Sequence, residues 1–159
     1  MNDEAEPAQA LDDANAPGDG MLAPVTPTAP GVWPTLRFTD AESALEWLVE
    51  VLGFTEHAVY RGDDERPIAH AELLWPEGGG IMIGSDAGEK SWSGAVGGPG
   101  SSSQYLSSAH TAAIFDRVVA AEWQVMRPLT EQDYGSLEFA CLDPEGNAWS
   151  IGTYRGENL

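Results

Sequence analysis

The sequence predicts an α+β fold of two βαβββ modules that form a cupped mixed sheet around a central cleft, with helices on the outer face. A repeat carries this prediction: residues 76–84 read PEGGGIMIG and residues 144–152 read PEGNAWSIG, with five of nine positions identical at an offset of 68. A segment with helical spacing lies upstream of each copy. Helix, extended segments and turn thus recur in the same order, which indicates an internal duplication.

The 159 residues suit one domain with an unusual start. Residues 1–30 hold six acids, no base, five prolines and seven alanines, without an apolar period. This composition predicts a disordered acidic tail over residues 1–31. The folded domain is expected over 32–156, with modules at 32–87 and 103–156 joined by a Gly- and Ser-rich linker at 88–102.

In the first module, a strand is expected at 33–38 and a helix at 40–52. Ala44, Leu45, Leu48, Val51 and Leu52 recur at helical intervals. Thr39 and Glu42 fit a capping box, and Gly53 fits a helix stop. Turn residues then separate three further strands, expected at 54–61, 68–75 and 81–84.

The second module repeats this order less cleanly. A strand is expected at 104–107 and a helix near 110–122, where Ile114, Phe115 and Val118 form the apolar stripe. The remaining strands are expected at 123–127, 137–142 and 148–153. Two sheets, each covered by a helix on one face only, would leave their other faces around a shared concavity suited to a small molecule.

Charge and cysteine content exclude several classes of function. Seven basic against 26 acidic residues give a net charge of −19, which argues against nucleic acid and anionic membranes as partners. No run of about 18 apolar residues could span a membrane. The single cysteine, Cys141, excludes an internal disulfide and lies in an apolar run, so we expect a buried, unreactive thiol in a cytoplasmic protein.

These residues resemble a known family. The paired modules, Asp40 at the first helix, Gly53-Phe54 after it, the run 143–147 (DPEGN) and the closing Gly152-Thr153-Tyr154-Arg155 are similar to the vicinal oxygen chelate superfamily. That superfamily includes glyoxalases, extradiol dioxygenases, fosfomycin-modifying transferases and bleomycin-resistance binding proteins. The similarity covers roughly residues 32–156, and it is greatest to uncharacterised glyoxalase/bleomycin-resistance-like proteins.

The resemblance implies a divalent metal held by His, Gln or Glu on the first and fourth strands of each module. The corresponding positions here fall near Trp33 or Thr35, Met82, Gln104 and Ser150. Among these only Gln104 carries a usual ligand, so we expect no metal cofactor and no catalytic residue. The alternative is a divalent metal at an unconventional set, formed by His70, Glu72, Gln104 and Glu138. His70 and Glu72 share a strand face, and the repeat offset places Glu138 at the position of His70.

A cavity that binds without reacting remains the first hypothesis. Aromatic side chains at strand ends and in loops, namely Trp33, Trp75, Trp92 and Tyr134, suit a planar ligand, although core packing would explain some of them equally well. On the resemblance, Arg37 points into the concavity, where it could bind a ligand carboxylate or pair with a Glu. The predicted ligand-binding set is Trp33, Thr35, Arg37, Met82, Trp92, Gln104, Tyr105, Tyr134 and Ser150.

The sequence therefore favours a homodimeric small-molecule-binding protein that sequesters a cationic or aromatic compound. The acidic charge would concentrate cations, although it would equally serve solubility. A glyoxalase-like lyase or isomerase, or a dioxygenase, is the enzymatic alternative. A third reading is a regulator that presents its acidic surface to a basic protein.

Overall fold

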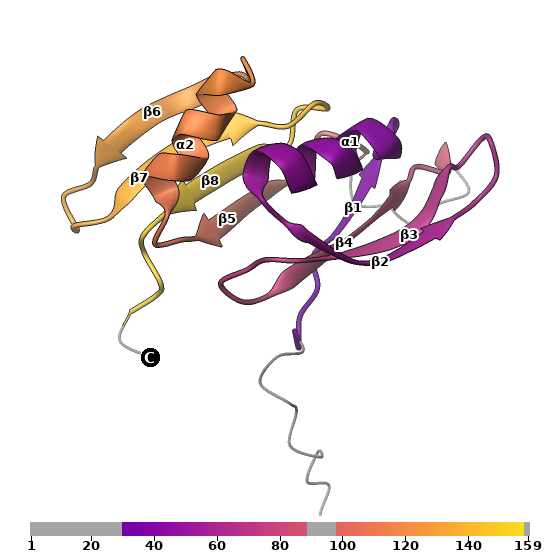
Figure 1. Cartoon of the computed structure of the whole chain (residues 1–159), viewed down its shortest axis with the longest axis horizontal. Helices are drawn as coiled ribbons and strands as arrows, with labels where there is room; N and C mark the ends of the chain where they lie inside the picture. Colours follow the sequence, from indigo (N-terminus) through magenta and orange to yellow (C-terminus); the bar gives the residue numbers. More distant parts are fainter. Residues whose placement is uncertain (1–29, 89–97, 158–159) are drawn as a thin grey trace, which may run out of the picture.

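The computed structural model describes residues 30–88 and 98–157. The chain forms two four-stranded mixed sheets, each with its own helix (Figure 1). Strand order is β1-β4-β3-β2 in one sheet and β5-β8-β7-β6 in the other. The identical order confirms the predicted α+β fold of two βαβββ modules. The sheets are separate and open, so they do not close into a barrel. Trp92, most of the tail expected at 1–31 and most of the linker expected at 88–102 lie outside the described residues.

Each module runs strand, helix, three strands, with the first strand parallel to the last and antiparallel pairs elsewhere. The first module comprises β1 (Thr35–Phe38), α1 (Ala41–Trp47), the π-helical turn η1 (Leu48–Leu52), β2 (Thr55–Arg61), β3 (Ile68–Leu74) and β4 (Gly80–Ser85). The second comprises β5 (Ser103–Ser107), α2 (Thr111–Ala120), β6 (Val125–Glu131), β7 (Leu137–Leu142) and β8 (Ala148–Gly152).

The first helix begins one residue later than the capping-box prediction requires. Its N-cap is Asp40, whose carboxylate accepts hydrogen bonds from the backbone N–H and the hydroxyl of Ser43. The prediction of Thr39 with Glu42 as a capping box was therefore wrong, because the Asp40 carboxylate one position on already satisfies the first turn. The predicted stop is confirmed: Gly53 has a left-handed φ of 101° and its N–H bonds to Leu48 O.

Strand β6 differs most from its predicted span, since it continues to Glu131 instead of ending at 127. It contains Pro128, which usually interrupts a sheet. The strand lies at the edge of its sheet, where a missing N–H leaves no ladder bond unmade, and its pairing with β7 is irregular on either side of Arg127. The local sequence does not show that a strand lies at the edge of its sheet, so the predicted strand was ended before Pro128.

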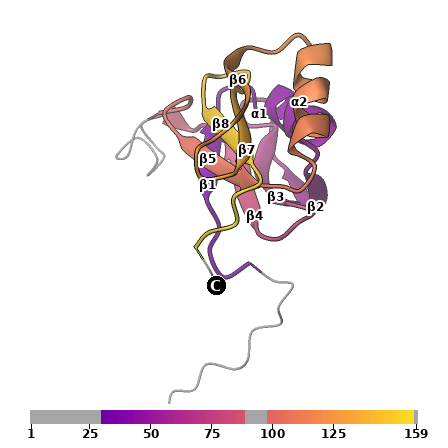
Figure 2. The same ribbon diagram turned by 90° about the vertical axis from the view of Figure 1, so that its left-hand side faces the viewer.

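One hydrophobic core joins the two modules. Figure 1 shows α1 and α2 side by side, with one sheet extending from either side of the pair, and Figure 2 shows both helices on the same side of the molecule. The indole of Trp47 on α1 lies 5.8 Å from that of Trp123 and 6.4 Å from that of Trp149 on β8. Arg117 of α2 donates to Val51 O and Leu52 O at the end of η1. The helices thus pack against the core face of each sheet and do not cover its other face.

Candidate functional site

Side chains alternate across each strand, so every sheet has a core face and an open face. In β1 and β4, Leu36, Phe38, Ile81 and Ile83 are buried in the core. The intervening residues lie on the other side, where Thr35 pairs with Met82, and Arg37 with Gly84, in the parallel register. We call this surface the first open face and define it as Thr35, Arg37, His70, Glu72, Met82 and Gly84.

Arg37 lies across Gly84 on the first open face. A Cβ at Gly84 would overlap the Arg37 guanidinium, so the glycine makes room for this side chain. The Nε of Arg37 is buried and has no hydrogen-bond partner among the described residues, nor does any carboxylate there come within ion-pair distance. Pairing with a Glu, one of the two sequence alternatives for Arg37, is not found among the described residues, and binding of a ligand carboxylate stays a prediction.

His70 and Glu72 lie on the first open face as the strand parity predicted. The His70 Nε2 is 3.2 Å from Glu72 Oε1, and the His57 Nε2 is 4.0 Å from Glu72 Oε2. Glu72 pairs in register with Met82, which belongs to the same sheet. His70 and Glu72 are therefore within hydrogen-bond distance of each other on β3, and His57 of the edge strand β2 lies only at ion-pair range of Glu72.

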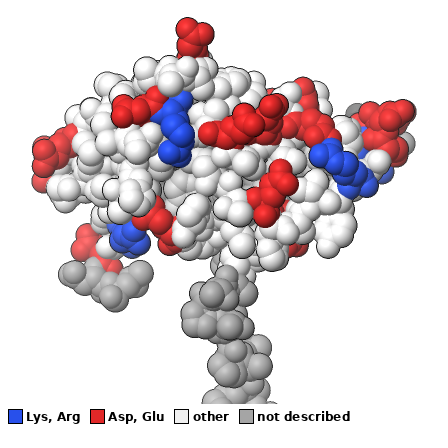
Figure 3. Space-filling model, viewed as in Figure 1, with Lys and Arg blue, Asp and Glu red and all other residues white. Residues whose placement is uncertain are grey.

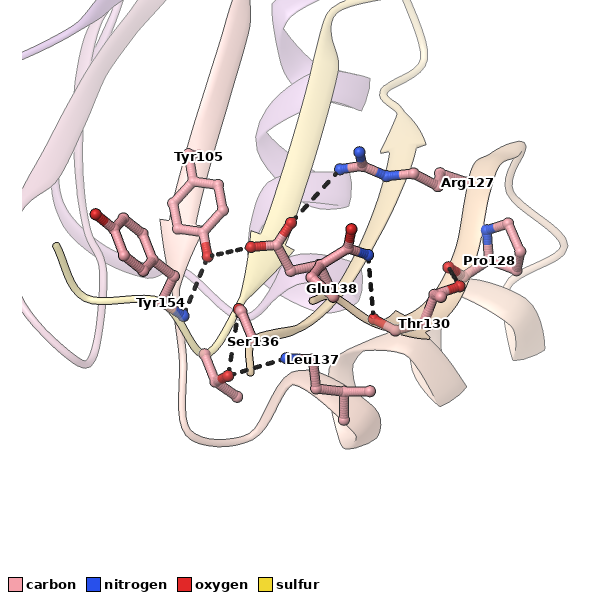
Figure 4. A network of polar contacts seen from close by, with 10 residues as sticks. Tyr105, Arg127, Pro128, Thr130, Ser136, Leu137, Glu138 and Tyr154 are labelled. Carbon is pink, nitrogen blue, oxygen red and sulfur yellow. Dashed lines mark hydrogen bonds and ion pairs between the residues drawn. The ribbon is translucent and has the colours of Figure 1, made fainter. Parts of the chain in front are cut away.

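The second open face is built around a buried carboxylate. It comprises Tyr105, Glu138, Ala140, Ser150 and Gly152, where Tyr105 pairs with Ser150, and Glu138 with Gly152. Glu138 is only 4% exposed. It accepts a hydrogen bond from the Tyr105 hydroxyl at 3.1 Å, and its other oxygen lies 3.8 Å from Arg127 Nη2 (Figure 4). The hydrogen bond from Tyr105 and the nearby guanidinium of Arg127 offset part of the cost of burying this carboxylate.

Three partly exposed tyrosines border Glu138. We define Tyr105, Tyr134 and Tyr154 as the tyrosine cluster; Tyr154 lies 6.4 Å from Tyr105 and 6.1 Å from Tyr134, both edge to face. Their exposed fractions are 43%, 65% and 40%, respectively. The backbone N–H of Tyr154 donates to the Tyr105 hydroxyl, which fixes that ring (Figure 4). Burial, and secondly the charge of Glu138, raise the pKa of Tyr105, so its hydroxyl stays a donor at neutral pH.

One of the four positions carried over from the resemblance, Gln104, does not lie on the open face in the structure. Gln104 has the same strand parity as core residue Leu106, and its register partner is the buried Trp149. Ser150 pairs with Tyr105 instead. Tyr105, and not Gln104, therefore shares the open face with Ser150; β5 contains no apolar alternation strong enough to show this in the sequence. Gln104 lines a separate cavity of about 510 Å³ at the junction of the modules.

The aromatic residues predicted to bind a ligand lie in different parts of the structure. Trp33 packs against the backbone of Gly80 at the start of β4. Trp75 is 8% exposed and donates from Nε1 to Ser107 O in the other module, so it serves the module junction. Tyr134 belongs to the tyrosine cluster. Sequence reasoning missed Tyr154 and Arg127: Tyr154 lies beyond the last strand, and the β6 irregularity hides the face to which Arg127 belongs.

The donor set at the equivalent strand positions does not fit the divalent metal implied by the resemblance. Thr35, Met82, Tyr105 and Ser150 offer hydroxyls, a thioether and a phenol, whereas such ions prefer imidazole and carboxylate. The unconventional set is divided, since His70 and Glu72 belong to the first sheet and Glu138 to the second. Within residues 30–88 and 98–157, no three His, Cys, Asp or Glu side chains gather as ligands would.

Two further findings bear on the class of protein. In the described part of the chain, no helix combines the length and apolar character needed to cross a membrane. The family model described as "Glyoxalase/Bleomycin resistance protein/Dioxygenase superfamily" matches residues 32–151. No protein among the curated sequences matches the chain.

Solved structures share the fold. The chain is similar to TioX from Micromonospora sp. ML1, at 25% identity and a TM-score of 0.65, covering 79% of this chain and 100% of that one. It is also similar to a glyoxylase/bleomycin resistance protein/dioxygenase domain from Frankia sp. EAN1pec, at 21% identity and a TM-score of 0.58, covering 80% and 99%. A glyoxalase/bleomycin resistance protein from Streptomyces sp. CB03234 has 19% identity and a TM-score of 0.56, covering 74% and 94%.

Proposed function

The chain belongs to the glyoxalase/bleomycin resistance protein/dioxygenase superfamily, and we propose from this premise that it binds a small aromatic compound on its second open face without the help of a metal. The observation that carries the proposal is the tyrosine cluster beside Glu138. Partly exposed aromatic rings held in place by a buried polar network provide a flat apolar surface with fixed hydrogen-bonding groups.

The pattern of charge favours an aromatic compound that carries a positive charge. The whole chain has a net charge of −19, which raises the local concentration of cations. Glu138 is itself opposed by Arg127 at 3.8 Å, so its charge is partly balanced before any ligand arrives. Stacking on the tyrosines would then supply most of the affinity, and the overall field would select cationic over anionic compounds.

We further propose that the binding protein is a homodimer whose two open faces meet across the subunits. The helices cover only the core face of each sheet, and Tyr60, at the β2 edge of the first sheet, is 61% exposed. The first open face of a second copy would bring Arg37 and Met82 opposite the tyrosine cluster. A ligand would then be enclosed between the tyrosine cluster and the first open face, with its positive charge on the side of Glu138 and away from Arg37.

The binding proposal is tested by thermal shift against planar aromatic compounds of positive, neutral and negative charge, and separately against bleomycin. Compounds that bind should raise the melting temperature, by linkage, and the stabilisation should grow with the logarithm of ligand concentration over Kd. Tyr134→Ala should abolish the shift, because it removes a ring that would contact the ligand. The ring is exposed, so its removal should leave the fold intact. Val119→Ala, which trims a 50% exposed side chain on α2, is the matched control. No shift with any compound, or an equal shift in Tyr134→Ala, would contradict the proposal.

Elemental analysis separates binding from the enzymatic alternative. Protein purified from cells and dialysed should carry substoichiometric metal, and ligand-induced thermal shifts should survive chelator unchanged. One tightly held divalent ion per chain, with an activity that the chelator removes, would favour a glyoxalase-like enzyme instead. Sedimentation velocity at micromolar concentration tests the homodimer, which predicts twice the mass of the 16.9 kDa chain.

A further inference from the structure

The second open face contains an ion pair that is looser than the others of its kind. In the described part of the chain, arginine pairs with glutamate three times, as Arg61 with Glu42, Arg155 with Glu77 and Arg127 with Glu138. Arg155 Nη2 lies 2.7 Å from Glu77 Oε1, whereas Arg127 Nη2 lies 3.8 Å from Glu138 Oε2, which is too far for a hydrogen bond. On the face shown in Figure 3, basic side chains are few and lie beside acidic ones. The loosest of the three pairs is thus the one next to the tyrosine cluster.

The carboxylate of this loose pair is also the one that most needs a close partner. The side chain of Glu138 is 5% exposed, against 19% for Glu77 and 41% for Glu42. Burial of a carboxylate is costly unless the group is paired and hydrogen-bonded. The Tyr105 hydroxyl meets this need at Oε1, but Arg127 reaches Oε2 only at ion-pair distance. Glu138 Oε2 is therefore left able to accept a closer N–H donor than the chain itself provides.

The guanidinium of Arg127 is held by little besides this pair. Its side chain is 49% exposed and makes no hydrogen bond to a described residue. Arg127 belongs to the edge strand β6, whose pairing with β7 is irregular on either side of it. Figure 4 shows Arg127 and Tyr105 approaching Glu138 from different sides. The guanidinium can therefore move into solvent while the hydrogen bond between Tyr105 and Glu138 stays in place.

The pair lies beside a ring on which the ligand is proposed to stack. Partial burial of its hydroxyl, and then its hydrogen bond to Glu138 and the charge of that residue, raise the pKa of Tyr134, whereas the charge of Arg127 lowers it. Both charges therefore act at the Tyr134 hydroxyl. The Tyr134 ring also packs edge to face against Tyr154, with centroids 6.1 Å apart. A substituent on an aromatic ring held at Tyr134 is thus close to the carboxylate of Glu138.

We propose that Arg127 is a specificity-determining residue, because its guanidinium occupies the position at Glu138 that an amidinium or guanidinium group of an aromatic ligand takes over on binding. This inference rests on the function proposed above, since the ligand ring must lie on the tyrosine cluster. A planar cation with N–H donors suits Glu138 Oε2 better than a quaternary ammonium, which has no N–H to donate. Arg127 competes with such a cation and lowers its affinity, whereas a neutral ligand meets no such competition.

The test uses benzamidinium and benzamide, which share a ring and a planar substituent but differ by one charge. NMR titrations of the full chain at neutral pH and low salt give the dissociation constant of each probe. Arg127→Met removes the competing cation, so benzamidinium should bind about fivefold more tightly or better, while benzamide should change by less than about twofold. Arg127→Gln, which is also neutral, should change the affinities in the same direction. Arg127→Lys restores a positive charge and should bring the ratio of the two constants back towards the wild-type value.

The matched control is Arg61→Met. It removes the same charge from the other edge strand, where the arginine is likewise half exposed or more and paired with a glutamate. The ratio of the two dissociation constants should change by less than about twofold in this variant, because Arg61 is not beside the tyrosine cluster. An equal gain for benzamidinium in Arg61→Met and Arg127→Met would overturn the proposal, since it would mean a general response to net charge.

The remaining outcomes separate this proposal from the function on which it rests. An unchanged ratio in Arg127→Met and Arg127→Gln would overturn the role of Arg127 alone, and benzamide binding that is lost in Tyr134→Ala would still support the proposed function. Absence of saturable binding by both probes in every variant would overturn both. A benzamidinium gain that persists when Arg127→Met is combined with Tyr134→Ala would support displacement of Arg127 and contradict the tyrosine cluster as the binding surface.

Discussion

The hydroxyl of Tyr105 and the carboxylate of Glu138 are joined by a hydrogen bond of 3.1 Å across a strand that lies between them. Tyr105 belongs to β5 and Glu138 to β7, and β8 separates the two. The contact crosses at Gly152 of β8, where a Cβ would lie 2.5 Å from the phenol oxygen and 2.6 Å from Glu138 Cγ. A missing side chain in one strand thus brings two functional groups from its neighbours together.

Replacing Tyr105 by Phe should destabilise the fold and change its response to alkali. The loss of one hydrogen bond to a buried carboxylate costs about 1–3 kcal/mol in the free energy of unfolding. Burial raises the pKa of Tyr105 in the folded chain, so its contribution is complete below the unfolded value of about 10 and is lost as pH rises through the folded pKa. Urea unfolding between pH 8 and 11 should therefore show the gap between wild type and Tyr105→Phe closing at the alkaline end. A gap that widens with pH would contradict this assignment.

Two glycine substitutions should differ in cost. Gly152→Ala forces Tyr105 and Glu138 apart inside a packed contact, for which overpacking costs about 1–3 kcal/mol. Gly84→Ala displaces chiefly the flexible end of Arg37, although Ala69 O at 3.1 Å is also close. Denaturant melts should accordingly place Gly152→Ala below Gly84→Ala in stability. The reverse order would mean that the tyrosine–glutamate contact is not packed as described.

Asp143 should be one of the most sensitive positions in the second module. It is 4% exposed and accepts four hydrogen bonds, from the backbone N–H groups of Glu145 and Asn147, Asn147 Nδ2 and Trp149 Nε1. Asp143→Ala leaves several buried donors unpaired, so we expect a loss of about 3 kcal/mol or more in chemical denaturation. Asp133→Asn, on the exposed β6–β7 turn, should change the stability by less than about 0.5 kcal/mol. Similar effects at both sites would show that the network contributes little.

The thiol of Cys141 should resist modification while the chain is folded. The residue is buried, and burial, with a smaller effect from the charge of Asp143, raises the pKa of its thiol to about 12. The nucleophilic thiolate is therefore nearly absent at pH 8. Reaction with a chromogenic disulfide should need unfolding, so its rate should rise steeply with urea across the unfolding transition. Rapid, stoichiometric labelling of the native protein would contradict a structural role.

The fold could be predicted because its signal is repeated. The offset of 68 between the PEG turns reappears as equal pairings, Glu72 with Met82 in one sheet and Ala140 with Ser150 in the other. The apolar stripe of the first helix was likewise predictive, because its residues Ala44, Leu45, Leu48 and Leu52 are all buried. Local ends were less predictable: the N-cap moved to Asp40, and β6 continued past Pro128, because caps and edge positions depend on three-dimensional neighbours.

The candidate site was only partly visible in the sequence. Thr35 and Arg37 share a face as strand parity predicted, and Met82 pairs in register with Thr35, but Gln104 has the parity of the core residue Leu106. The tyrosine cluster unites β5, the β6–β7 turn and the segment after β8, so no spacing along the chain announces it.

The most direct test of the central claim is a crystal structure of the protein with the aromatic compound that gives the largest thermal shift. The account predicts ring density within about 4 Å of Tyr105, Tyr134 and Tyr154, and Glu138 still bonded to Tyr105. It also predicts that no ion is coordinated by Thr35, Met82, Tyr105 or Ser150. A compound bound away from the tyrosine cluster, or a metal ion bridging the compound to the strand positions, would contradict it.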